Sequence, residues 1–339
     1  MYKIVIAVLL LHPIFCKGQK SKIDDKDTLL QKIISDPSQQ EIDDTLFKLK
    51  QRDLSPKNVL IHDSIVLANT NTLYVLSHIV EDNTHYGAVI VPKRKDDLKL
   101  PIIIFATGGD GIHTEFDIST DFNHRAVQFP SFLGENLDEE FMVVIPSFRG
   151  QQLSIGNKKY LSEGSVGDAF DGATTDALGF LNVVLGNFDQ ADKDRIGILG
   201  GSRGGTVALL ASVRDKRIKR AVVIAAPSDM KALYGLYPNQ FKLLFFKDLL
   251  SGNISEKEAR QRFIASSPIH FAKELPLVQL HHDVNDPFVP IDFAKNLVLK
   301  MMERKNGVHL YSYEENIHGF WDDEQYWARV QDFIKKLGK

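Results

Sequence analysis

The chain has 339 residues, of which 43% are hydrophobic and 25% are charged, and its formal net charge is −3. A chain of this length can bury a large core, as one large α/β domain or as two smaller ones. The near-neutral charge and the absence of a long basic run exclude binding to nucleic acid driven by electrostatics. Cys16 is the only cysteine, so the sequence predicts neither disulfides nor thiol chemistry in the rest of the chain.

The first 18 residues have the pattern of an export signal. A short basic start, 1–3, precedes an apolar run, 4–15, which is too short to span a bilayer. Cys16-Lys17-Gly18 then supplies small residues at the positions that a signal peptidase reads. This predicts export to the periplasm or the extracellular space, with cleavage before Gln19 and no stable membrane insertion. In the alternative, a lipoprotein signal, Cys16 is acylated, but a bulky phenylalanine precedes it where such signals have a small residue.

A polar segment rich in lysine and aspartate follows, from 19 to 55. Apolar residues between Leu29 and Ile34 recur at helical spacing, which predicts short amphipathic helices. Two interpretations remain open: a lead-in that packs on the following domain, or a stalk that is partly mobile. The expected organisation is a signal segment 1–18, this helical lead-in, and one domain over 56–339.

Within that domain, the pattern predicts antiparallel strands first and an alternation of strands and helices afterwards. Strand-like segments with tight polar breaks lie between 59 and 92, and the charged "KRKDDLK" that follows is interpreted as a hairpin loop. Nearly continuous apolar runs come next, as is typical of strands buried on both faces of a parallel sheet. Alternation with helices predicts a doubly wound, mostly parallel sheet. The runs are PIIIFA, FMVVIPS, RIGILG, RAVVIAA, PLVQL and VHLYSY, and the helix candidates are 171–185, 204–214, 292–304 and 323–337.

The segment "RIGILGGSRGG", from Arg195 to Gly205, places one serine between two pairs of glycines where a strand is predicted to end. The glycines fit an ordinary strand-to-helix turn. They also fit a nucleophile elbow, in which they make room for a strained serine whose hydroxyl points outward. The pattern Gly-x-Ser-x-Gly occurs once, at 200–204, and Ser202 follows a predicted strand and opens a predicted helix. Ser202 is therefore the candidate nucleophile.

An elbow of this kind needs an acid and then a histidine later in the chain. "LVQLHHDVNDPFVP" leaves a predicted strand and enters a loop with Asp286, and "LYSYEENIHGF" leaves the last strand and delivers His318. Loops at the carboxyl ends of parallel strands converge at one edge of a sheet. In the predicted triad, Asp286 orients the imidazole of His318, which takes the proton of Ser202 and returns it to the leaving group.

Other polar residues near the predicted acid have alternative interpretations. Asp283 is the rival acid because it lies nearer the strand, but the prolines after Asp286 fix a turn around Asp286 and favour it. His281 and His282 are interpreted as structural residues at a strand end. Adjacent residues of a strand point to opposite faces, so His281, His282 and Asp283 cannot all bind one ion. We expect no metal and no other cofactor.

Acyl transfer also requires N–H donors for the developing oxyanion. One candidate is the backbone N–H of Arg203, the residue after the nucleophile. The second is expected after an earlier strand, in "IIIFATGGDG", where the N–H of Gly109 is preferred and Gly108 and Asp110 are neighbours that could serve. The glycine pair also fits an ordinary turn, and it lacks the residues of a phosphate-binding loop.

The stretch 228–272 is longer than a simple crossover between two strands. Its segment "LYGLYPNQFKLLFFKDLL" is rich in aromatic residues. Most of them fit the buried face of a helix. The alternative is a small lid over Ser202 that contributes an apolar pocket.

"RIGILGGSRGG", "SPIHFAKELPLVQLHHDVNDPFVP" and "HGF" together resemble the catalytic domain of the prolyl oligopeptidase family, within the α/β-hydrolase superfamily. The upstream "IPSFRGQQLSIGNKKYLSEGSVGDAFDGATTDALGFL" is also similar to that family, and the resemblance covers roughly 101–339. It implies an α/β-hydrolase fold and the triad of Ser202, Asp286 and His318.

The chain departs from the family pattern in three places. The region before residue 100 is far too short for the β-propeller of full-length oligopeptidases. Thr107-Gly108-Gly109 stands where His-Gly-Gly is common, and His282-Asp283 replaces the usual His-Gly before the acid. These departures favour an esterase, because many relatives without the propeller are esterases.

The sequence thus predicts a secreted serine hydrolase that cleaves carboxylic esters through an acyl-enzyme. A serine peptidase acting on short peptides is the alternative, and an inactive binding protein with a hydrolase fold is a third. The expected partner is a small-molecule ester or a short peptide, with no nucleic acid, and the oligomeric state is open.

Overall fold

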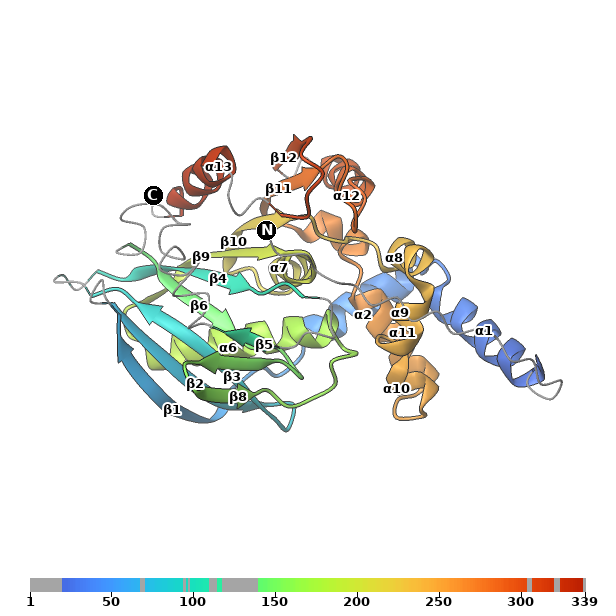
Figure 1. Ribbon diagram of the computed structural model, residues 1–339, viewed down its shortest axis with the longest axis horizontal. Helices are drawn as coiled ribbons and strands as arrows, with labels where there is room; N and C mark the ends of the chain where they lie inside the picture. The colour runs from blue at the N-terminus through green and yellow to red at the C-terminus, as the bar shows by residue number, and fades with distance from the viewer. Residues whose placement is uncertain are drawn as a thin grey trace.

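A long mixed β-sheet organises the computed structural model of the chain, with helices against its faces (Figure 1). The structure describes residues 20–67, 71–93, 96, 98–109, 115–117, 140–303, 307–319 and 324–337. The predicted signal segment 1–18 and Asp110 lie outside these residues. The strands of the main sheet are β1 (Lys57–Val66), β2 (Thr72–Val80), β3 (Asn83–Val91), β4 (Leu100–Ala106), β6 (Met142–Pro146), β9 (Ala191–Gly201), β10 (Ile218–Ile224), β11 (Leu277–Asp283) and β12 (Val308–Tyr313).

The described strands follow the order β1-β2-β3-β6-β4-β9-β10-β11-β12. Pairing is antiparallel from β1 through β3 to β6 and parallel from β6 to β12. The predicted mostly parallel sheet with antiparallel N-terminal strands is therefore confirmed. The interpretation of "KRKDDLK" as a hairpin loop is wrong, because β6 pairs with both β3 and β4 and lies between them. Which strands become neighbours depends on contacts distant in the chain, and local pattern does not report those.

The helices fall into three groups along the chain. Two lie at the N-terminal end of the described residues, four α-helices and one 3-10 helix lie between β10 and β11, and the others alternate with strands of the sheet. In order they are α1 (Lys20–Ile34), α2 (Gln39–Lys50), α6 (Asp171–Asn187), α7 (Arg203–Arg214), α8 (Met230–Leu236), α9 (Pro238–Leu243), α10 (Lys247–Leu250), α11 (Glu256–Ala265), the 3-10 helix η2 (Pro268–Glu274), α12 (Asp292–Met302) and α13 (Glu324–Lys335). None of these helices has the length and apolar character needed to cross a membrane, as far as the described residues extend.

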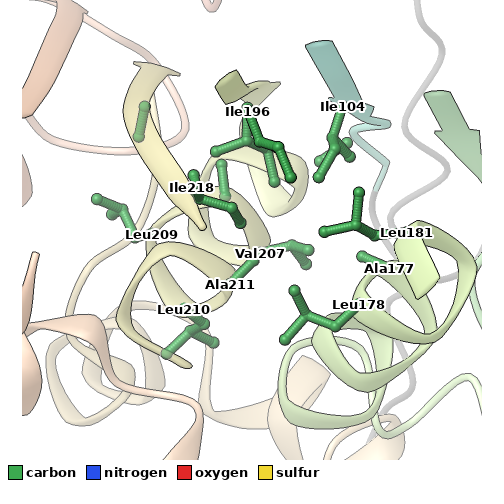
Figure 2. Packing of buried hydrophobic residues seen from close by; sticks show 14 of the residues in the cluster. Ile104, Ala177, Leu178, Leu181, Ile196, Val207, Leu209, Leu210, Ala211 and Ile218 are labelled. Atoms are coloured by element: carbon green, nitrogen blue, oxygen red, sulfur yellow. The ribbon is translucent and has the colours of Figure 1, made fainter. Parts of the chain in front are cut away.

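One face of the sheet packs on α6, α7 and α12. Figure 2 shows Val207 of α7 beside Leu181 of α6, with Ile104 of β4 and Ile196 of β9 above them. All four side chains are buried. Burying an aliphatic side chain of this size stabilises the fold by about 1.5–3 kcal/mol. This core fixes the start of α7 against the ends of β4 and β9, which is where the candidate site lies.

The opposite face of the sheet is covered by α13 and by a small second sheet. Tyr326 and Val330 of α13 are fully buried against this face. The second sheet has the order β5-β7-β8 and contributes the buried Leu153. Its strands are β5 (Glu115–Asp117), β7 (Gln152–Ile155) and β8 (Lys158–Leu161). Coverage on both faces explains why the central strands are nearly continuous apolar runs.

Candidate active site

Ser202 occupies a sharp turn between β9 and α7. Its backbone has φ 53° and ψ −123°, a conformation that costs a residue other than glycine about 1–3 kcal/mol. The Ser202 N–H donates to the carbonyl of Ile224 on β10 (2.8 Å), and the Ser202 carbonyl accepts from the N–H of Gly205 (3.0 Å). Neighbouring elements thus hold the strained residue in place from both sides, as a nucleophile elbow requires.

The glycines around Ser202 are required by close packing. A Cβ added at Gly204 would lie 2.0 Å from the carbonyl oxygen of Ala106, and one added at Gly200 would lie 2.3 Å from the carbonyl oxygen of Gly204. The start of α7 therefore sits directly on the ends of β4 and β9. A Cβ at Gly108 would lie 3.1 Å from the Gly201 carbonyl oxygen, which brings the Gly108-Gly109 turn against the same elbow.

The buried Asp286 and the partly buried His318 form a hydrogen-bonded pair. The His318 Nδ1 lies 2.7 Å from Asp286 Oδ2, and Asp286 Oδ1 accepts the N–H groups of Phe288 (2.8 Å) and Val289 (2.9 Å). Burial acts to raise the pKa of the Asp286 carboxyl, but the hydrogen bonds from His318 and from the two N–H groups outweigh burial and lower that pKa. The Phe288 ring packs edge-on against the imidazole at 5.4 Å between centroids. A carboxylate in this position can fix the imidazole tautomer and stabilise its cation.

Asp283, the rival acid, braces the sheet edge. Its Oδ1 accepts the N–H of Asn285 (2.8 Å) and its Oδ2 accepts the N–H of Glu315 (2.7 Å). The carboxylate thereby joins the end of β11 to the end of β12. The side chain is fully buried, so these hydrogen bonds are needed to compensate its desolvation.

The two histidines before Asp283 also lie in the interior. His281 Nδ1 lies 2.7 Å from the hydroxyl of Tyr313, and burial, together with the charge of Arg329, lowers the pKa of His281 to about 3. His282 Nε2 donates to the carbonyl of Val289 (2.7 Å), in the turn that follows Asp286. Both contacts support the turn and the strand.

A cavity of about 610 Å³ brings the candidate residues together. Ser202, His318, Gly109 and Arg203 all line it, and Asp286 reaches it through its bond to His318. Gly109 has φ 129°, a conformation that favours glycine. The Arg203 side chain donates to the Gly108 carbonyl (3.1 Å) and lies over the ring of Phe148 (5.3 Å). The candidate nucleophile, base and oxyanion donors thus share one cavity.

The walls of this cavity are mostly apolar. The insertion 228–272 contributes Leu233, Tyr237, Phe241 and Phe245, so several of its aromatic residues are at once core residues and cavity walls. No charged side chain apart from Arg203 stands among the described lining residues, histidine excepted. Such a surface favours an apolar group of the substrate.

One wall was not identified from the sequence. The loop 166–170 lines the cavity with Val166 and Phe170, and a Cβ at Gly167 would lie 2.4 Å from the Leu244 carbonyl oxygen. The two glycines in "EGSVGD" are the only local sign of so close a contact with the insertion.

Ion pairs of three buried carboxylates hold this loop in place. Arg149 contacts Asp168 (2.9 Å) and Asp176 (2.7 Å), and Arg52 contacts Asp171 (2.9 Å). Asp168 and Asp171 bracket Phe170, so their pairing turns the apolar side chain toward the cavity. The sequence suggests that Arg149 pairs with nearby acids, as it does with Asp168 and Asp176, but it does not indicate that these pairs support a pocket.

Among the residues that the structure describes, no group of three or more His, Cys, Asp or Glu side chains is arranged to hold a metal ion.

The geometry above is that of an α/β-hydrolase with a serine elbow. Residues 133–339 match the model of the prolyl oligopeptidase family, and the chain belongs to that family. It is thus a serine hydrolase with an α/β-hydrolase fold. No curated protein sequence matches the chain.

Solved structures with the same fold include esterases and peptidases. Acetyl xylan esterase 1 from Thermoanaerobacterium sp. JW/SL YS485 is 18% identical with a TM-score of 0.64, over 91% of this chain and 99% of that chain. A Mycobacterium tuberculosis puromycin-hydrolyzing peptidase is 16% identical with a TM-score of 0.56, over 82% of this chain and 46% of that one. An acylaminoacyl peptidase from Pyrococcus horikoshii is 16% identical with a TM-score of 0.54, over 83% and 52%. The chain therefore spans about half the length of these peptidases and nearly all of the esterase.

Proposed function

We propose that the protein is an exported carboxylesterase that uses Ser202, His318 and Asp286 as a catalytic triad. The observation that carries the proposal is the 2.7 Å contact of His318 Nδ1 with a buried Asp286, beside the cavity that His318 shares with the strained Ser202. This arrangement suits a serine that is deprotonated as it attacks.

The reaction proceeds in two stages. Ser202 Oγ attacks the ester carbonyl while His318 takes the hydroxyl proton, and the N–H groups of Arg203 and Gly109 stabilise the oxyanion. The carbon–oxygen bond to the alcohol then breaks, and His318 returns the proton to the departing alkoxide. A water molecule then attacks the acyl-enzyme while His318 takes one of its protons. His318 passes this proton to Ser202 Oγ as the bond to the acyl group breaks and the carboxylic acid leaves.

Esters are preferred over peptides because of the quality of the fold matches. The match to the acetyl xylan esterase has a TM-score of 0.64 and covers 99% of that chain, whereas the matches to the two peptidases have TM-scores of 0.56 and 0.54 and cover 46% and 52%. Hydrolysis of short peptides is the second candidate function, and the family match favours it. Export with cleavage before Gln19 is part of the proposal and rests on the pattern of residues 1–18.

A fluorophosphonate probe tests the nucleophile, since it bonds covalently to an activated serine. We expect labelling of the wild type at Ser202 and none of Ser202→Ala. Turnover of p-nitrophenyl esters is then compared with that of aminoacyl and prolyl p-nitroanilides. Faster turnover of the anilides would make the peptidase the better assignment, and labelling at another serine would reject the triad. Mass spectrometry of the exported protein checks for a start at Gln19 and for a lipid on Cys16.

A further inference from the structure

The N-terminal helix α1 packs on the insertion that forms a wall of the cavity (Figure 1). Leu30, Ile33 and Ile34 of α1 are buried in one apolar cluster with the insertion helices. The same cluster holds Leu233, Phe241, Phe245 and Val289, which line the cavity beside Ser202. A helix at the start of the described chain thus shares a core with the cavity wall more than 190 residues later.

Aromatic side chains connect α1 to the wall through α11. Phe263 of α11 stacks on Phe246 (6.0 Å between centroids) and meets Phe245 edge-on (6.1 Å). Phe245 in turn contacts Phe241 of α9 at 5.3 Å. Interiors of this kind are close-packed, so a shift of α11 relative to α1 is passed on to Phe241 and Phe245.

Arg260 of α11 locks the end of α1 to the insertion. Its Nη1 donates to the carbonyl oxygens of Ile33 (2.7 Å) and Ser35 (2.6 Å), where the last turn of α1 leaves carbonyls without partners in the helix. Its Nε and Nη2 donate to the two carboxylate oxygens of Glu41, at 3.0 and 3.2 Å. The Arg260 side chain is 15% exposed and that of Glu41 is 42% exposed, so the bonds are charge-assisted and solvent screens the Glu41 pair in part.

Other ion pairs along α1 are exposed. Lys32 contacts Glu256 at 3.1 Å, but these side chains are 74% and 55% exposed. Pairs of this kind contribute little to stability. Lys32 therefore offers a control position on the same helix, close to Ile33 in sequence and without a part in the apolar cluster.

We propose that α1 and Arg260 form a clasp that positions the insertion wall, and so set how well the enzyme accepts esters with a bulky apolar acyl group. Arg260 and Ile33 are positioning residues, which act through Phe241 and Phe245 and do not touch the substrate. The substrate part of this inference rests on the proposed esterase function. A small acyl group such as acetyl needs only the residues around Ser202, so its turnover is independent of the clasp.

The test compares p-nitrophenyl acetate with p-nitrophenyl hexanoate, because both release the same leaving group. For Arg260→Ala we expect KM for the hexanoate to rise roughly tenfold, with kcat/KM for the acetate within about twofold of the wild type. Ile33→Ala should change the same ratio in the same direction. Arg260→Lys keeps the charge without the forked donors and should give an intermediate ratio, and it serves if Arg260→Ala fails to fold. Lys32→Ala should leave both substrates unchanged.

Amide hydrogen exchange measures the wall without catalysis. Exchange over 238–246 should accelerate in Arg260→Ala and Ile33→Ala and stay at the wild-type rate in Lys32→Ala. A proportional loss with both esters, or unchanged exchange over 238–246, would overturn the clasp. Failure of the esterase proposal is distinct: the wild type would turn over neither ester or leave Ser202 unlabelled, and the exchange experiment would still decide whether α1 positions the wall.

Discussion

Two regions of the molecule form the cavity, and they are built on different principles. The carboxyl ends of the strands position Ser202 and Asp286 through hydrogen bonds with backbone groups, of β10 and α7 for Ser202 and of the following turn for Asp286, and Asp286 in turn holds His318. The helical insertion positions its wall through side-chain packing with α1, which is distant in the chain. The comparison suggests that chemistry depends on local geometry and is therefore intolerant of change, whereas the choice of substrate depends on a core that can shift.

The largest expected effect is on turnover, and it distinguishes Asp286 from Asp283, two carboxylates at the end of β11. Asp286→Asn should lower kcat for p-nitrophenyl acetate by about 10³–10⁴-fold, because an amide cannot hold the imidazole tautomer that accepts the serine proton. Asp283→Asn should keep kcat within a few-fold of the wild type. It should instead lower the free energy of unfolding by about 1–3 kcal/mol, because the amide replaces one of the two buried oxygens that accept N–H groups. Steady-state kinetics and urea unfolding of both variants measure this. If Asp283→Asn is the slower enzyme, the acid has been wrongly assigned.

The next largest effect concerns the closeness of α7 to the strands. Gly204→Ala should destabilise the protein by several kcal/mol, because its Cβ would lie 2.0 Å from a backbone oxygen that cannot move freely. Gly186→Ala in α6 is the matched control. A Cβ there meets nothing within 4 Å, so we expect a gain of about 0.5–1 kcal/mol from helix propensity. Equal unfolding midpoints in urea for the two variants would contradict the packing at the elbow.

Much of the sheet and of the elbow was predictable from sequence, because both follow local rules. The segment "TLYVLSHIV" coincides with β2, and α6 and α7 begin within a residue of the predicted starts. Gly-x-Ser-x-Gly after an apolar run predicted the turn that the structure has at Ser202. Candidates for base and acid followed from strand ends alone. Their roles remain predictions, although the structure brings His318 and Asp286 within hydrogen-bond distance.

The rest of the cavity was beyond prediction because it depends on partners far apart in the chain. The spacing between Leu29 and Ile34 predicted an apolar helix face, and it did not reveal that the face packs on α11. Phe170 has no local sign of a role, since ion pairs of Asp168 and Asp171 with distant arginines orient its loop. A strand order that places β6 between β3 and β4 is unpredictable for the same reason.

A smaller effect distinguishes the sheet from the helical insertion by the pH range in which each loses stability. Burial, beside His85, lowers the pKa of His78 on β2 to about 4 from 6.5, so the unfolded chain binds more protons between these values. The contribution of neutral His78 to the free energy of unfolding is therefore fully present above pH 6.5. It is lost, by up to a few kcal/mol, as pH drops to about 4. Hydrogen bonds from Arg260 lower the pKa of Glu41 from 4.5 to about 2, so the contribution of the Glu41–Arg260 pair is lost only as pH falls between these lower values.

Unfolding free energies measured from pH 7 to pH 2 check this order of events. His78→Leu should reduce the slope of the profile between pH 6.5 and 4, where other buried histidines also contribute, and Glu41→Gln should reduce it only below pH 4.5. The Glu41 effect should be the smaller, because its side chain is 42% exposed and solvent screens the pair. A change of slope in Glu41→Gln above pH 4.5 would mean that Arg260 does not lower the pKa of Glu41 as the contacts between them predict.

The smallest effect tests a hydrogen bond between the insertion and the loop that carries Asp286, the acid loop. The Tyr237 hydroxyl, in the insertion, donates to the carbonyl of Phe288 at 2.6 Å. Phe288 in turn donates its N–H to Asp286 and packs its ring on His318. Tyr237→Phe removes a single hydrogen bond worth about 1 kcal/mol and keeps the ring in the wall.

If this bond couples the wall to the acid loop, Tyr237→Phe should lower kcat/KM about two- to fivefold for p-nitrophenyl acetate and hexanoate alike, since it disturbs His318 and not the wall. For Arg260→Ala, in contrast, we expect an effect on the hexanoate and almost none on the acetate. Tyr234→Phe is the control, because its ring contacts with Phe241 and Phe246 remain and its hydroxyl is not bonded to the acid loop. A loss for the hexanoate alone would place Tyr237 with the wall. In that case the acid loop would belong to both regions: it would hold the catalytic residues and also form part of the packed pocket.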